Sequence, residues 1–349
     1  MFAKEGRDKE AMGGKKVQKR GSYRKRKYPL RTRKRRLKQR LLVLESLVVL
    51  FLAALVFGEK LPFYGGFGTV TVDGNRVQGD AVTAPDGSSG GENKNDDAGE
   101  LILTYLDVGQ ADCTILQYGE HAMMVDGGGR STSKEVVEAA ESLGIKRFDY
   151  IVATHGHEDH IGGLPTVLRA FPADTVIFRE DENKSQIYGE FLETIKESGA
   201  AVMAPEPGDT FMFGGATVQV LAPKEPMSDT NNRSIALMVT FGERKFLFTG
   251  DAEEESEKKM LALGLPLEAD VFQAGHHGSQ TSNTQDFLEA VDPVYVVISC
   301  GEGNSYGHPH SEVIARFEDL DVQIYRTDTM GTITVKTDGK SLGITTQRK

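Results

Sequence analysis

One heptapeptide constrains this chain more than any other feature. Residues 154–160 read Thr-His-Gly-His-Glu-Asp-His and directly follow the apolar run 150–153. That run predicts a strand, and the glycine pair 162–163 places the heptapeptide on a loop at the strand's carboxyl end, where sites of α/β folds usually lie. Imidazole and carboxylate are ligands for zinc and manganese. We therefore expect four metal ligands here: His155, His157, Asp159 and His160.

The distribution of histidine supports this interpretation. Seven of the eight histidines fall in three short clusters, and only His121, which we expect at the surface, stands alone. Within the heptapeptide, residues 155 and 157 can point the same way in extended chain, while 159 and 160 turn elsewhere as a helix begins. Two ligand pairs predict two cations about 3.5–4 Å apart, the spacing of two-metal hydrolases. The alternative is a polar loop that starts a helix and contains histidines by chance.

The pattern His-x-His-x-Asp-His after an apolar strand resembles the signature of the metallo-β-lactamase superfamily. Further motifs of that family follow in order: Asp126 before three glycines, Asp251 at the end of 246–251, and a His-His-Gly-Ser stretch within 271–279. The match spans roughly residues 100–347. It implies a four-layer αββα sandwich that binds two divalent cations, zinc or manganese, with Asp251 bridging them. The implied metal ligands are His155, His157, Asp159, His160, Asp251 and the last histidine of the family, and the choice between His276 and His277 for that ligand stays open.

A narrower resemblance is to the ComEC type, the hydrolase domain at the end of a DNA-uptake channel. It depends on residues 106–112, on His-His-Gly-Ser and on residues 305–310; a phosphorylcholine esterase of the bacterial surface is similar too. The resemblance implies that Asp159 is both a ligand and a partner of the attacking water, with His277 or His308 as proton donor. Substrate-binding or orienting roles are expected for Asp126, Asn231, Asn232, Ser279, Tyr306 and His310.

The chain departs from the superfamily pattern at one ligand position. Many members have a histidine before the strand that leads to the bridging aspartate, but residues 230–234 read Thr-Asn-Asn-Arg-Ser. An amide oxygen is a weaker and harder ligand than imidazole. Either one metal is bound less tightly, or an asparagine contacts the substrate. Both alternatives leave manganese as well as zinc open.

Alternation of strand-like and helical runs supports an α/β fold. We expect strands at 101–106, 113–118, 122–125, 150–153, 175–178, 217–221, 235–241, 245–249, 294–299 and 332–336. We expect helices at 133–142, 164–170, 187–198, 253–263, 284–290 and 311–317.

The first hundred residues differ from the remainder. Residues 1–40 hold 18 Lys/Arg and 3 Asp/Glu, and an apolar run from Leu41 to Phe57 follows, interrupted only by Glu45 and Ser46. This predicts a basic cytoplasmic segment (1–40), a single transmembrane anchor (41–58), a flexible tether (59–99) and a hydrolase domain outside the cell (100–349). A cleaved secretory signal is the rival interpretation. A basic nucleic-acid patch is a third.

The charge of the remainder limits the substrate. Residues 41–349 carry 41 − 18 = 23 basic and 51 − 3 = 48 acidic residues, a net charge of −25. Tight nonspecific binding of DNA by such a body is unfavourable, although two cations would reverse the local sign. The two cysteines, Cys113 and Cys300, lie in or beside apolar runs and are expected to be buried thiols, with a bond between them left open.

Three functions remain open from sequence. The first is a membrane-anchored extracellular phosphodiesterase or nuclease that acts on single-stranded nucleic acid and needs no nucleotide cofactor. The second is a hydrolase of cell-envelope phosphodiesters, such as phosphorylcholine esters, or of another small ester. The third is a noncatalytic surface module stabilised by its metals.

Overall fold

The computed structural model describes residues 99–181 and 183–349. The predicted basic segment (1–40), the anchor (41–58) and nearly all of the tether (59–99) lie outside these residues. Within the described part of the chain, no helix is both long enough and apolar enough to cross a bilayer.

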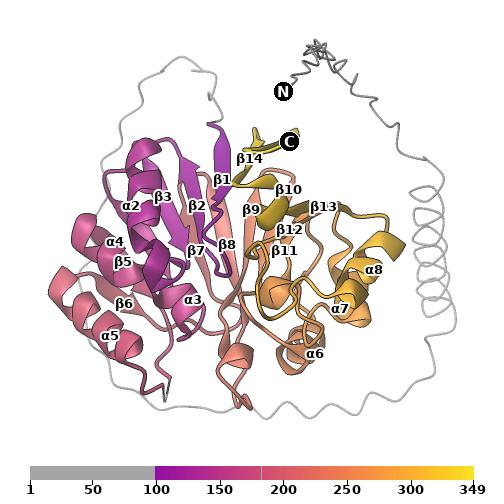
Figure 1. Ribbon diagram of the computed structural model, residues 1–349, viewed down its shortest axis with the longest axis horizontal. Coiled ribbons are helices and arrows are strands. Elements are labelled where there is room, and N and C mark those ends of the chain that lie inside the picture. Colours follow the sequence, from indigo (N-terminus) through magenta and orange to yellow (C-terminus); the bar gives the residue numbers. More distant parts are fainter. Residues whose placement is uncertain (1–98, 182) are drawn as a thin grey trace, which may run out of the picture. The chain divides into compact units, whose positions relative to one another are not determined.

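Two mixed β-sheets form the centre of the domain (Figure 1). The first sheet has eight strands, and β3 to β6 run parallel. In spatial order they are β15 (Leu342–Thr346), β14 (Ile333–Thr337), β1 (Leu101–Tyr105), β2 (Thr114–Tyr118), β3 (His121–Val125), β4 (Phe148–Val152), β5 (Ala173–Ile177) and β6 (Ala201–Met203).

The second sheet has seven strands, and β10 to β13 run parallel. In spatial order they are β13 (Gln323–Arg326), β12 (Tyr295–Ile298), β11 (Val271–Gln273), β10 (Arg244–Phe248), β9 (Ala236–Phe241), β8 (Ala216–Ala222) and β7 (Thr210–Phe213).

Helices cover the outer face of each sheet (Figure 1). On the first sheet they are α2 (Ser133–Ser142), α3 (Glu158–Ile161), α4 (Leu164–Ala170) and α5 (Gln186–Ser198). On the second they are α6 (Glu254–Leu263), α7 (Gln285–Val291) and α8 (Ser311–Asp319), and a short helix, α9 (Thr327–Met330), follows β13. Three separate apolar cores result: one under each helical layer and one between the sheets. The expected four-layer αββα sandwich is therefore observed.

Strand β10 shows how the sequence produces these layers. Successive side chains of a strand point to opposite faces. Phe246 and Phe248 accordingly lie in the core between the sheets, while Leu247 lies in the core under α6 and α7. All three are at most 1% exposed. A strand covered on both faces has to be apolar throughout, which is why this run is conspicuous in the sequence.

The parallel strands place their carboxyl ends at one edge of each sheet. Chain leaving β3 and β4 carries Asp126 and the heptapeptide, and chain leaving β10 and β11 carries Asp251 and the His276-His277 pair. Residues distant in sequence meet there because parallel neighbours end on the same side.

All ten expected strands and six expected helices are present, with ends that differ by one to two residues. Five strands were not expected: β6, β7, β11, β13 and β15. Strands β6, β7, β13 and β15 lie at sheet edges and expose much of their surface, and β11 has only three residues. Their hydrophobic patterns are accordingly weak.

Candidate metal centre

The heptapeptide begins where β4 ends and directs its ligands to two places. His157 precedes α3, and His160 lies within that helix. His155 Nε2 and His157 Nδ1 are 3.0 Å apart. His160 Nε2 lies instead 4.0 Å from the Asp159 carboxylate. The two predicted pairs thus fall in two different ligand groups, although the rings of His155 and His160 lie side by side with centroids 4.1 Å apart.

Asp251 lies between these pairs, and its two oxygens face different imidazoles. Its Oδ1 is 3.2 Å from His160 Nε2 and 3.7 Å from His277 Nε2. Its Oδ2 is 3.8 Å from His155 Nε2 and 3.5 Å from His276 Nε2. Asp251 is thus shared between the two sets of imidazoles.

Two ligand groups follow from these contacts. Asp159, His160, Asp251 and His277 have ligand atoms within 4.8 Å of one another, as do His155, His157 and Asp251. His276 lies on the side of the second group, through Asp251 Oδ2. It supplies an imidazole on the side where residues 230–234 lack the histidine found in many family members.

The buried polar atoms fit a bound cation. His160 Nε2 and Asp251 Oδ1 are both buried and have no hydrogen-bond partner among the described residues. A buried polar atom without a partner costs about 1–3 kcal/mol, and an ion is one of its standard explanations. The donor set of imidazoles and carboxylates suits zinc or manganese.

Three outer carboxylates orient the histidines. Asp126 Oδ2 lies 2.8 Å from His160 Nδ1, Asp112 Oδ1 lies 3.3 Å from His277 Nδ1, and Glu253 Oε1 lies 3.1 Å from His276 Nδ1. His277 Nδ1 also lies 3.0 Å from the Ser299 carbonyl, which accepts its hydrogen bond. Such a partner on Nδ1 fixes the ring and directs Nε2 toward the metal.

Further residues hold these carboxylates in place. Asp126 also accepts hydrogen bonds from the backbone N–H and the hydroxyl of Thr154, both at 2.8 Å. Gln273 Nε2 donates to Asp112 Oδ2 at 2.8 Å, and Thr114 Oγ1 donates to Gln273 at 3.2 Å. The predicted orienting role of Asp126 is consistent with this geometry.

The loop that carries the histidine pair is strained. His276 and His277 have φ values of 51° and 54°, in the left-handed region, which costs a non-glycine residue roughly 1–2 kcal/mol. Asn283 offsets this cost, because its side chain accepts from Gly275 N at 3.0 Å and donates to Gly275 O at 2.9 Å. Buried Glu257 supports the same turn by accepting from Asn283 N at 2.6 Å.

Burial and neighbouring charges shift the pKa values of the side chains at the centre. Burial alone would raise the pKa of Asp251, but His160 and His277 hold it well below its usual range. Burial would likewise lower the pKa of His160 and His277, but Asp251 and the carboxylates behind the two rings hold both well above theirs. For His155, burial and His160 together keep the pKa well below its usual range.

The two asparagines take positions behind His276. Asn231 Nδ2 donates to Glu253 Oε1 at 3.2 Å. Asn232 Oδ1 accepts from Glu253 N and Ser256 N at the start of α6, and its Nδ2 donates to Asp229 at 2.9 Å. The structure therefore places both amides where they orient Glu253.

The loop after β12 brings the last histidines over the centre. His308 is 9% exposed, and its ring centroid lies 5.5 Å from that of His276. Burial and the neighbouring imidazoles lower the pKa of His308 to about 4, so the ring is neutral at neutral pH. Gln110 Nε2 lies 3.3 Å from its Nδ1. With Nδ1 accepting from that amide, Nε2 carries the proton.

Three other expected substrate residues lie near this loop. Tyr306 is 68% exposed and stacks on His308 with centroids 5.6 Å apart. His310 Nδ1 accepts from Gln280 N at 3.0 Å. Ser279 is buried, and its hydroxyl lies 3.0 Å from that of Thr281. The structure thus keeps Ser279 in a local hydrogen-bond network and leaves Tyr306 at the rim.

Sequence reasoning missed Glu253, Gln273 and Asn283, and it noted Gln110 and Asp112 only as part of the 106–112 motif. The spacing Asp-Ala-Glu at 251–253 was the one available signal for Glu253. His121 is exposed, as expected, and lies 3.1 Å from Asp149. Cys113 and Cys300 are buried free thiols in different cores.

Comparison with known proteins agrees with the geometry. Residues 106–302 match the family model described as the metallo-beta-lactamase superfamily. ComE operon protein 3 of Bacillus subtilis is 29% identical over 201 residues, which cover 57% of this chain and 26% of that protein. Competence protein ComA of Neisseria gonorrhoeae is 29% identical over 237 residues, which cover 67% of this chain and 32% of that protein.

The chain is also similar to a solved structure, that of the metallo-beta-lactamase fold protein YhfI of Bacillus subtilis. The alignment covers 68% of this chain and 100% of YhfI, with 12% identity and a TM-score of 0.48. The present chain spans only about a quarter to a third of the length of the two curated relatives. The family match alone covers more than half of the chain. The chain belongs to the metallo-beta-lactamase superfamily, as a metal-dependent hydrolase similar to the ComEC type.

Proposed function

We propose that this protein is a two-metal phosphodiesterase that cleaves single-stranded nucleic acid. The observation that carries the proposal is the position of Asp251, whose two oxygens face two separate sets of imidazoles. Sites that hold two metals stabilise both the attacking and the leaving oxygen of an in-line displacement at phosphorus. A relative named for competence supports a nucleic-acid substrate.

The chemistry would divide between the cations and the side chains around them. Two divalent cations, zinc or manganese, would lower the pKa of a water molecule and offset negative charge on the phosphate. Asp159 is the most exposed carboxylate of the centre, at 37%, and can accept a hydrogen bond from the attacking water. His277 Nε2 lies 3.3 Å from Asp159, so the two side chains can hold the same cation.

A neutral His308 suits the leaving-group side. Its lowered pKa means that it donates a hydrogen bond from Nε2 as neutral imidazole, in place of a full proton from imidazolium. Gln110 fixes that tautomer and also accepts from Gly301 N at 3.1 Å, which anchors the loop over the centre. His308 thereby stabilises the leaving oxygen.

A second candidate is a phosphodiesterase of the cell envelope. The observation that favours it is the net charge of −25 over residues 41–349, which disfavours long-range attraction of a polyanion. A small diester with one negative charge meets less repulsion than a strand does.

We also propose that residues 41–58 anchor the hydrolase to the cell membrane, with the N-terminus in the cytoplasm and the hydrolase outside. Support comes from the apolar run and from the 18 Lys/Arg before it, since basic flanks stay in the cytoplasm.

Substitution of two carboxylates of the centre should distinguish a hydrolase from a noncatalytic module that is only stabilised by its metals. We expect Asp251→Ala and Asp159→Ala to reduce hydrolysis of bis-(p-nitrophenyl) phosphate and single-stranded DNA by at least about 10³-fold, because each removes a ligand and its charge. Metal content, measured by mass spectrometry after loading with manganese or zinc, should fall in parallel. Normal turnover in either variant would reject the proposal, and cleavage of the small diester alone would favour the second candidate.

Removing the carboxylate behind His276 should weaken one metal selectively. We expect Glu253→Gln to lower the affinity for the more weakly bound cation by about 10–100-fold. Activity should recover in excess metal, because every direct ligand remains. The matched control is Glu254→Gln, whose carboxylate lies on the exposed face of α6 and pairs with Lys258. Equal metal affinity in the Glu253 and Glu254 variants would refute the orienting role.

Metal binding should release protons at neutral pH. Because the pKa values of His160 and His277 are held well above the usual range, both rings are protonated without metal. A cation has to displace these protons, so affinity should rise with pH and be lost on acidification. Calorimetry in buffers of different ionisation enthalpy should show about two protons released. His121→Ala, at an exposed site, should release the same number; zero release would contradict the assignment.

Protease protection should reveal the orientation in the membrane. In intact cells, external protease should degrade the hydrolase domain but leave an epitope at the N-terminus intact, because the basic flank remains in the cytoplasm. Recovery of the domain in the culture medium would favour a cleaved signal.

A further inference from the structure

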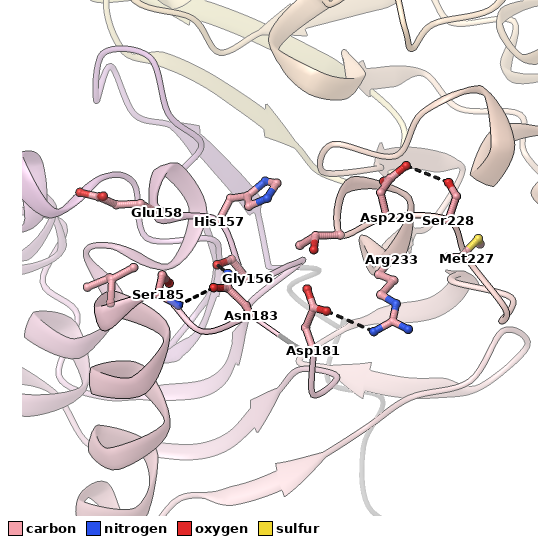
Figure 2. Close-up of a pocket in the computed structure, with 12 residues that line it drawn as sticks. Gly156, His157, Glu158, Asp181, Asn183, Ser185, Met227, Ser228, Asp229 and Arg233 are labelled. Atoms are coloured by element: carbon pink, nitrogen blue, oxygen red, sulfur yellow. Dashed lines mark hydrogen bonds and ion pairs between the residues drawn. The ribbon is translucent and has the colours of Figure 1, made fainter.

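A pocket of about 590 Å³ opens directly beside the metal centre, next to His157 (Figure 2). Three segments form it: the start of α3, the loop that precedes α5, and the loop that leads to Arg233. Because His157 belongs to one ligand group, a substrate whose phosphate lies at the centre would extend one of its ester groups into this space. We refer to it as the His157 pocket.

Among the described residues, Arg233 is the one Lys or Arg side chain that lines the His157 pocket, and it is already paired with carboxylates. Arg233 Nη1 donates to Asp181 Oδ1 at 3.1 Å (Figure 2). Its Nε lies 3.5 Å from Glu225 Oε1. The guanidinium is only 32% exposed. It therefore serves to hold two loops together and is poorly placed to receive a phosphate.

The remaining charge in the pocket is negative. Glu158 is an exposed lining residue at the start of α3, next to His157, and its carboxylate points outward at the rim of the pocket, away from Asp229 (Figure 2). Asp229 lies across the pocket, where it accepts hydrogen bonds from Ser228 Oγ at 2.8 Å and from Asn232 (Figure 2). Hydroxyls of Ser185, Ser228 and Thr230 supply much of the rest of the polar lining. Lys184, in the adjoining loop, is exposed but does not line the pocket.

From this juxtaposition we propose that the His157 pocket binds the group esterified to the scissile phosphate and selects one that is uncharged or cationic and rich in hydroxyl or amino groups. A second phosphate at that place is disfavoured. The proposal rests on the proposed phosphodiesterase function and narrows its substrate class.

The consequence for nucleic acid is a restriction on where the strand is cut. An internal linkage has a further phosphate on each side, and one of these would face Glu158 and Asp229. A terminal linkage can present a nucleoside without a second phosphate. The enzyme should thus prefer strand ends and small diesters over internal linkages.

The test uses three p-nitrophenyl phosphodiesters whose second alcohol carries a 2-aminoethyl, 2-methoxyethyl or 2-phosphoethyl group. With the metal-loaded full chain, kcat/KM should fall in that order, by about three- to tenfold between the first and the last, because two charges at this range interact modestly across partly screened space. The difference should shrink as salt is added. Equal kcat/KM for all three diesters would overturn the proposal.

Charge reversal at one exposed residue gives the decisive comparison. Glu158→Lys should reduce or invert the preference for the amine over the phosphate, and Glu158→Gln should have an intermediate effect. Glu318→Lys, an exposed glutamate on α8 outside the pocket, is the matched control for overall charge and should leave the order unchanged. A preference that responds equally to both charge reversals would place its origin outside the pocket.

The same experiments distinguish failure of the proposed phosphodiesterase function from failure of the pocket proposal. If none of the three diesters is hydrolysed, the phosphodiesterase proposal fails. The pocket is then tested by calorimetric binding of 2-aminoethyl phosphate, 2-methoxyethyl phosphate and ethylene glycol bisphosphate to the metal-loaded protein. The same order of affinity, weakened by Glu158→Lys, would sustain the pocket's selectivity, and equal affinities would overturn it.

Discussion

The buried carboxylate of Asp251 is the constraint from which the rest of the structure follows. A buried charge is tolerated only where other groups compensate it closely. Here the compensation comes from imidazoles of both sheets: His155 and His160 follow β4, and His276 and His277 follow β11. The two sheets therefore have to present their parallel carboxyl ends at one common edge. Compensation of the Asp251 charge therefore requires both the ligand geometry of the centre and the packing of the two sheets against each other.

The two sides of Asp251 differ in ways that matter for binding. His160 and His277, on the Oδ1 side, each have a carboxylate behind Nδ1 and are buried. On the Oδ2 side only His276 has a carboxylate, Glu253, at its Nδ1, while His155 Nδ1 faces the hydroxyls of Thr154 and Ser234, at 3.2 and 3.3 Å. A carboxylate partner makes an imidazole a more basic ligand than a hydroxyl does. The Oδ1 side should therefore hold its cation more tightly, and the Oδ2 side, with partly exposed His157 and His276, should exchange.

Much of this could be predicted from the sequence, for identifiable reasons. Ligands that lie close together in the sequence, such as His155 to His160, can be recognised from the sequence because one short loop supplies them. Runs such as 246–248 mark strands covered on both faces. Residues that act through another residue were harder to find, because only the fold brings them near. Glu253 depends on a strained turn 23 residues later that points His276 back toward α6, a geometry no spacing rule contains.

The missing histidine shows this limit most clearly. Sequence reasoning considered Asn231 and Asn232 as a weak ligand or a substrate contact, since they occupy the expected stretch. In the structure that stretch supports Glu253, and Glu253 supports His276, which contacts the Oδ2 side. A histidine from the next loop thus lies on the Oδ2 side, while the asparagines of residues 230–234 lie behind it. The left-handed backbone of His276 and His277 is what permits adjacent residues to face opposite oxygens of one carboxylate.

An acidic body around a site for a polyanionic group appears contradictory until the range of each charge is considered. The net charge of −25 over residues 41–349 acts over distances at which salt screens it, with a Debye length of about 8 Å at physiological ionic strength. On the proposed function, two dications would act at contact distance and dominate there. Acidity at intermediate range, in the His157 pocket, would then act on whatever is attached to the phosphate. On this proposal, charges that barely affect binding of one phosphate would discriminate against a second, because they lie farther from the first phosphate than the metals do.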